Sequence, residues 1–100
     1  QAVQYLLRAA QMRNPYPEAH HNLGIVYLRK EMHAEAIEQF RTTLQQQPDH
    51  GPAALNLALA YQLKGELQRA KEELQAYVEK YGASNSPYVA QAQQRLGALK

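Results

Sequence analysis

The sequence predicts an all-α array of paired antiparallel helices, and three observations support this prediction. First, Ala, Gln and Leu are abundant while Gly and Pro number only five each in 100 residues, a composition that favours helix over sheet. Second, apolar residues recur at the i, i+3, i+4, i+7 spacing of helices that bury one face. Third, the chain resembles itself after a shift of 34 residues, which indicates a repeat architecture.

The 34-residue shift matches residues by size as well as by type. Small residues fall on small ones and large residues on large ones across the whole period, which chance similarity between two helices would not maintain. The matching columns are Leu23 with Leu57, Tyr27 with Tyr61, Ala2 with Ala36 and Ala70, and Leu6 with Phe40 and Leu74.

A complete helical pair is predicted over residues 17–50. Its first helix, at 21–30, carries apolar residues on one face and ends in charged ones. Its second helix, at 34–47, must stop before Pro48, which lacks the backbone donor that a helix needs. The apolar positions of the second helix are Ala36, Ile37, Phe40 and Leu44.

A second pair is predicted over residues 51–84, with helices at 53–64 and 67–81. Gly65 separates the two helices and suits the left-handed residue that commonly closes a helix. The two units therefore repeat the same helix–turn–helix plan.

We expect each end of the chain to hold part of a further unit. Residues 1–14 are predicted to form the second helix of a truncated repeat. Ser86 and Pro87 supply an N-cap and a first-turn proline, so 86–100 are predicted as the first helix of a further repeat or a capping helix. In total, six helices are expected.

These columns resemble the tetratricopeptide repeat family, whose 34-residue unit keeps a Leu-Gly pair, a Tyr, an Ala, a large apolar residue and a Pro at fixed offsets. The resemblance covers essentially the whole chain and implies a right-handed superhelix, that is, a TPR-like α-solenoid. One unit fills the pattern with Leu23-Gly24, Tyr27, Ala36, Phe40 and Pro48, and the next with Leu57-Ala58, Tyr61, Gly65, Ala70 and Leu74.

The chain departs from the family pattern at a few positions. Glu31 replaces the usual glycine between the helices, and Gly82 stands for the closing proline. Near the end of the chain Leu96-Gly97 echoes Leu23-Gly24, so both glycines are expected where helices cross closely.

Catalysis is not expected, because no convergent set of polar groups can be found. His20 and His21 are adjacent, so on a helix they point about 100° apart and cannot chelate one ion together. A metal site from His20 with His50 or another residue is the alternative to the preferred interpretation, packing or surface histidines. The serines Ser84 and Ser86 both lie in a linker. We therefore predict no enzyme activity, no metal and no cofactor.

The charge and the hydropathy of the sequence argue against two further functional classes, nucleic-acid-binding proteins and membrane-spanning proteins. Eleven basic and nine acidic side chains give a net charge of +2, and they are interspersed, so the chain lacks the basic stripe of an RNA-reading helical repeat. No apolar run approaches the roughly 18 residues that a membrane span needs. We expect neither nucleic-acid binding nor a membrane span, although an RNA-binding repeat remains the alternative from another class.

The resemblance implies a protein–protein interaction scaffold whose first helices line a concave groove that holds a partner segment. The segment 53–63 is apolar nearly all round, and a helix apolar on two faces is normally covered on both. Neighbouring first helices, a partner peptide or protein, or a second copy of the chain could cover its outer stripe. The predicted groove residues are Glu18, His21, Ile25, Leu28, Arg29, Leu55, Leu59, Gln62, Leu63 and Gln94.

One stretch bears on origin. Residues 80–88 followed by Leu96-Gly97 resemble the segment between repeats in tetratricopeptide proteins of the bacterial envelope. This resemblance implies a bacterial protein and leaves the cytoplasm and the periplasm both open.

Overall fold

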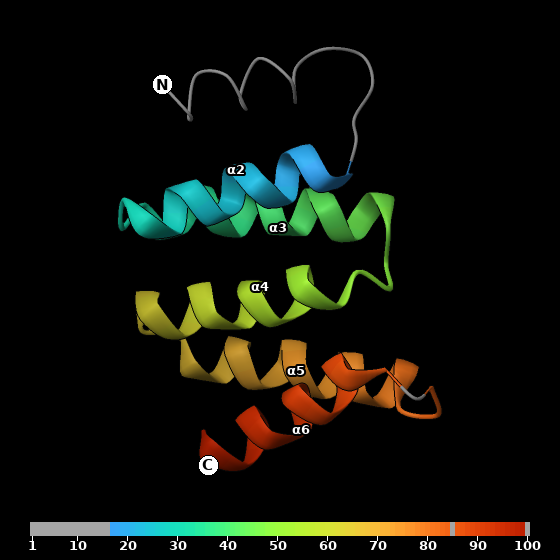
Figure 1. The fold of residues 1–100 in the computed structure, drawn as a ribbon. Helices are drawn as coiled ribbons and strands as arrows, with labels where there is room; N and C mark the ends of the chain where they lie inside the picture. Colours follow the sequence, from blue (N-terminus) through green and yellow to red (C-terminus); the bar gives the residue numbers. More distant parts are fainter. Residues whose placement is uncertain (1–16, 85, 100) are drawn as a thin grey trace.

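The computed structural model describes residues 17–84 and 86–99, and in this part of the chain all regular structure is helical. Consecutive helices pack against one another down the stack (Figure 1), which confirms the predicted all-α helical repeat array. There are five described helices, not six, because the helix predicted over 1–14 lies outside the described residues. They are α2 (Pro17–Arg29), α3 (His33–Gln46), α4 (Gly51–Lys64), α5 (Leu67–Tyr81) and α6 (Pro87–Ala98).

The first helices of successive units lie next to one another. Besides its neighbours in sequence, α4 contacts both α2 and α6, whereas the second helices α3 and α5 do not approach each other within the described residues. The stack is therefore tighter on the side of α2, α4 and α6. Helix α4 lies at its centre, with four helices around it.

The central position of α4 explains why its sequence is apolar nearly all round. Eight of its residues are buried, whereas α5 buries three and α6 buries two. Three of the size-matched columns of the sequence are buried in both units, which explains why the repeat keeps residue size at these positions. These columns are Leu23 with Leu57, Ala36 with Ala70, and Phe40 with Leu74.

The turn between the two helices has the same geometry in both units. The backbone N–H of Met32 donates to Tyr27 O at 2.8 Å, and one period later that of Glu66 donates to Tyr61 O at 2.8 Å. The residue before each donor has a positive φ, 60° at Glu31 and 95° at Gly65. Glu31 thus adopts the left-handed conformation despite its side chain, at a cost of about 1 kcal/mol. The departure from the family pattern leaves the turn unchanged.

The prediction of close helix crossings is confirmed at Gly24 and wrong at Gly97. A Cβ atom added at Gly24 would lie 2.6 Å from Cε1 of Phe40, so only glycine fits between α2 and α3. A Cβ atom at Gly97 would meet no described atom within 4 Å. The reason is register: Gly97 lies five residues beyond the position two periods after Gly24, and that position is Ala92, which is buried.

Candidate functional site

The predicted groove residues fall into three classes of exposure. His21 and Leu55 are buried, and Ile25, Leu28 and Leu59 are half-buried. The remaining five side chains, which are polar apart from one leucine, are exposed: Glu18, Arg29, Gln62, Leu63 and Gln94.

The outer apolar stripe of α4 consists of Leu55, Leu59 and Leu63. Its first residue is covered by a neighbouring helix, and its last residue is exposed to solvent. Leu55 is 5% exposed, and Arg95 of α6 donates from Nη1 to the Leu55 carbonyl at 3.1 Å, which places α6 at this end of the stripe. Leu59 is half-buried, and Leu63 is 53% exposed. The accessible part of the stripe is therefore its second half.

The exposed large apolar side chains of the described chain gather at the turns within the units. Met32 lies in the turn between α2 and α3, Leu63 lies in the last turn of α4, and Leu67 begins α5. Both turns lie at the same end of the stack, on the left in Figure 1.

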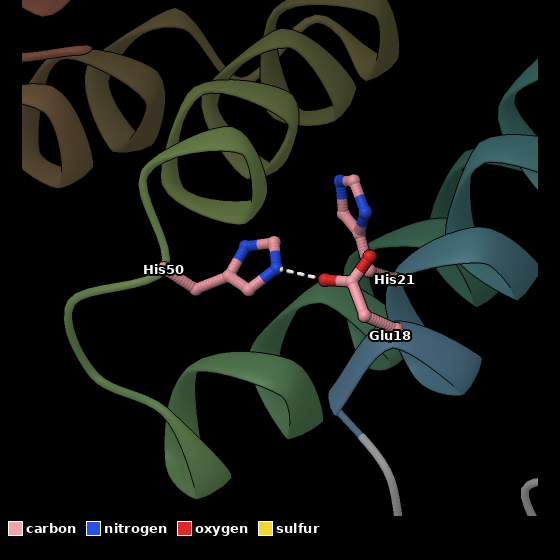
Figure 2. A group of neighbouring side chains, drawn as sticks. All are labelled: Glu18, His21 and His50. Carbon is pink, nitrogen blue, oxygen red and sulfur yellow. Dashed lines mark hydrogen bonds and ion pairs between the residues drawn. The ribbon is translucent and has the colours of Figure 1, made fainter. Parts of the chain in front are cut away.

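A second cluster lies near the start of the first helices, and it is polar. Glu18 in the first turn of α2, His21 one turn later and His50 at the N-cap of α4 point toward one another (Figure 2). His50 donates from Nε2 to Glu18 Oε1 at 2.6 Å, while its Nδ1 accepts the backbone N–H of Ala53 at 3.1 Å. The imidazole rings of His21 and His50 lie 4.8 Å apart between centroids.

Burial and charge shift the pKa values in this cluster. The hydrogen bond from His50 lowers the pKa of the exposed Glu18 carboxyl. Burial, with a smaller contribution from His50, lowers the pKa of His21, so its imidazole is neutral at pH 7. His21 Nε2 lies 3.1 Å from the side-chain nitrogen of Asn56, whereas Nδ1 is buried and has no hydrogen-bond partner among the described residues.

His20 was the predicted partner of His50 in the alternative metal site, but its Nδ1 instead lies 2.8 Å from Oε1 of Gln39 on α3. His21, which was not predicted for such a site, lies beside His50 in its place. A usable signal was present: Glu18 and His21 are three residues apart on one helix. His50 comes one period after residue 16, so the stacking of units places it beside the start of α2.

A cavity of about 460 Å³ adjoins the polar cluster. It opens between the starts of α2, α4 and α6 and the end of α5, and both Glu18 and His50 contribute to its wall. Apart from Gly51 and Pro52, the other residues that line it are polar or aromatic, among them Asp49, Tyr77, Tyr81 and Tyr88.

The stacked helical pairs, with a turn hydrogen bond that recurs after 34 residues, define a helical repeat protein. Comparison with known families identifies the particular class. Two sequence profiles described as tetratricopeptide repeat match residues 27–96 and 1–50. The chain belongs to the tetratricopeptide repeat family.

Membership of this family indicates what such repeats generally do. Repeats of this family generally mediate protein–protein interaction and are generally non-catalytic. No curated protein matches the chain significantly. The bacterial envelope type stays a prediction. Across the described residues, no helix combines the length and the apolar character that crossing a membrane requires.

Proposed function

We propose that this chain is a non-catalytic scaffold that binds an extended segment of a protein partner on the side formed by α2, α4 and α6. The observation that supports the proposal most directly is the open half of the α4 stripe. Leu63 is 53% exposed in the last turn of a helix that buries eight of its residues. An exposed leucine next to a half-buried one forms an apolar surface that a partner can cover.

The same register on α2 extends this surface. Ile25 precedes Leu59 by one period, and both side chains are half-buried, so they form an apolar strip across two adjacent first helices. Arg29 precedes Leu63 by one period and is exposed, which places a positive charge at the edge of the strip. The surface fits a segment with apolar anchors and an acidic residue beside them.

A second copy of the chain is the alternative occupant of the same surface. The exposed leucine favours homo-oligomerisation as well as peptide binding, because both cover apolar area. Sedimentation of the chain alone separates the two. A concentration-dependent dimer that Leu63→Lys abolishes would support self-association.

Peptides selected by the chain from a random peptide library provide the test of the scaffold function. Leu63→Lys should weaken their binding by about 2 kcal/mol, or roughly thirtyfold in Kd, if Leu63 is a central contact. Its stability should stay within about 0.5 kcal/mol of the parent, because the side chain is exposed.

Leu67→Lys is the matched control, since Leu67 is 47% exposed but lies on a second helix. It should leave peptide affinity unchanged. Equal losses in both variants, or a library that yields no binding peptide, would contradict the proposed surface.

A further inference from the structure

The polar cluster contains a buried nitrogen that its surroundings do not satisfy. His21 is 7% exposed, and no described group forms a hydrogen bond with its Nδ1. Leaving a buried polar atom unpaired is costly, and native structures usually resolve such a case with a water or an ion. The nearest potential ligands are the side chains of Glu18 and His50, each of which offers one atom within 4.8 Å of the others.

We propose that Glu18, His21 and His50 bind a divalent transition-metal ion, with Zn²⁺ as the first candidate. Two imidazoles and one carboxylate form a ligand set that suits Zn²⁺ and related ions. This site is independent of the apolar surface of α4.

The geometry requires a small contraction of the cluster. Metal–ligand bonds of about 2.0–2.1 Å in a tetrahedron place neighbouring ligand atoms roughly 3.3 Å apart. Glu18 can supply most of the movement, because its side chain is 68% exposed in the first turn of α2. The two histidines are buried, and their neighbours hold them in place.

Each histidine must present a lone pair to the ion. Asn56 lies beside Nε2 of His21, at 3.1 Å, while Nδ1 has no partner among the described residues. With the amide oxygen of Asn56 turned toward it, Nε2–H is donated and Nδ1 keeps its lone pair. This is the arrangement usual for a metal-ligating histidine, whose other nitrogen donates to an outer partner.

His50 must exchange one interaction for another. In the metal-free protein its Nε2–H donates to Glu18, and its Nδ1 accepts from Ala53. When the ion takes the Nε2 lone pair, the proton moves to Nδ1, which then no longer caps α4. Loss of one helix cap should weaken metal binding about fivefold without preventing it.

The bound ion would join two repeat units. Glu18 and His21 belong to the first helix of one unit, and His50 to the start of the next. Three protein ligands leave a fourth position open, and the cavity beside Glu18 and His50 provides space for a water or a partner's side chain.

Titration of the metal-stripped chain with Zn²⁺, followed by calorimetry, tests the site. The parent should bind one ion per chain. Glu18→Gln retains an oxygen that accepts the His50 Nε2–H, so it should fold as the parent does, yet it should bind Zn²⁺ at least about tenfold more weakly. His33→Gln, which removes a histidine outside the cluster, should change the affinity less than about twofold.

Two further measurements distinguish a lost metal site from a variant that does not fold. Zn²⁺ at a hundredfold excess over its Kd should raise the Tm by about 10 °C, because it binds the folded state. Co²⁺ in place of Zn²⁺ should give the intense visible absorption of a four-coordinate site. No binding, an unchanged affinity in Glu18→Gln, or the weak absorption of a six-coordinate ion would overturn the proposal.

Discussion

Successive first helices contact each other at two places, between α2 and α4 and between α4 and α6. These two contacts, here called the first and the second joint, differ in chemistry. At the joint between α2 and α4, the N-cap of α4 is His50, whose Nδ1 accepts the N–H of Ala53. At the joint between α4 and α6, the N-cap of α6 is Ser86, whose Oγ accepts the N–H of Tyr88 at 3.2 Å. Both residues satisfy a free donor of the helix start.

The difference is in what each capping residue does with the rest of its side chain. The cap is the one hydrogen bond that the Ser86 hydroxyl makes among the described residues. The second joint is held instead by Arg95 of α6, which donates to the Leu55 carbonyl, and by the ring of Tyr88 lying over Gly51. The histidine has a second nitrogen, and it reaches Glu18 on α2. Capping needs only one acceptor, so a larger capping residue can link two units and carry further chemistry.

The largest loss of stability is expected from a substitution that creates a steric overlap at the second joint. Gly51→Ala should destabilise the fold by about 2 kcal/mol, because the new methyl group would overlap Tyr88 from its Cβ to its ring. Rotation of the ring cannot relieve an overlap that includes Cβ, so α6 must shift as a whole. Urea unfolding followed by circular dichroism measures the loss.

Gly97→Ala is the control on the same helix pair. An added Cβ meets no described atom within 4 Å there, so the change should be neutral or stabilise by about 0.5 kcal/mol. Equal effects of the two alanines would show that Tyr88 does not fix the second joint.

A smaller effect is expected when the capping residue of the second joint is placed in the first. His50→Ser keeps a capping oxygen but removes the link to Glu18 and leaves a space where a buried imidazole was. We expect a loss of about 1–2 kcal/mol in urea unfolding. If the metal site exists, the variant should also lose the rise in Tm with Zn²⁺.

His33→Ser serves as the reference, since it removes a histidine at the start of α3 outside the cluster. It should cost less than about 0.5 kcal/mol. A His50→Ser variant as stable as this reference would show that the link to Glu18 contributes nothing to the first joint.

The fold was largely predictable because the repeat encodes it in side-chain size. Leu23, Phe40 and their counterparts one period later are all buried, so periodicity alone gave the helical pairs and their core. Glu31 shows why a departure from the family pattern did no harm, since the turn hydrogen bond survives with a positive φ.

The polar cluster was not predictable in the same way. Adjacent residues such as His20 and His21 look equivalent in the sequence, and only the rotation of α2 about its axis decides which one faces α4. The sequence also could not show which leucine of the α4 stripe is exposed, for a similar reason. Whether Leu55 or Leu63 is covered depends on where α6 crosses α4.

Outside both joints, Glu73 on α5 provides a carboxyl group that contrasts with Glu18. Burial raises the pKa of Glu73 above its ordinary value of 4.5, whereas the hydrogen bond from His50 lowers the pKa of Glu18. The Glu18 link therefore weakens as pH falls through the lowered pKa of the folded state. Glu73 behaves in the opposite way, because its charged form is the one that the fold disfavours.

The smallest predicted effect on stability follows from the raised pKa of Glu73. At pH 7 Glu73→Gln should stabilise the chain slightly, by up to about 0.5 kcal/mol, because it removes a partly buried charge. As pH falls through the raised pKa of folded Glu73 toward the unfolded value near 4.5, the parent gains a proton and the advantage of the variant should disappear. Urea midpoints measured from pH 7 to pH 4 follow this difference, with the exposed Glu38→Gln as the reference. A difference between Glu73→Gln and the parent that stays constant over this range would mean that packing, not the desolvated charge, sets the effect at position 73.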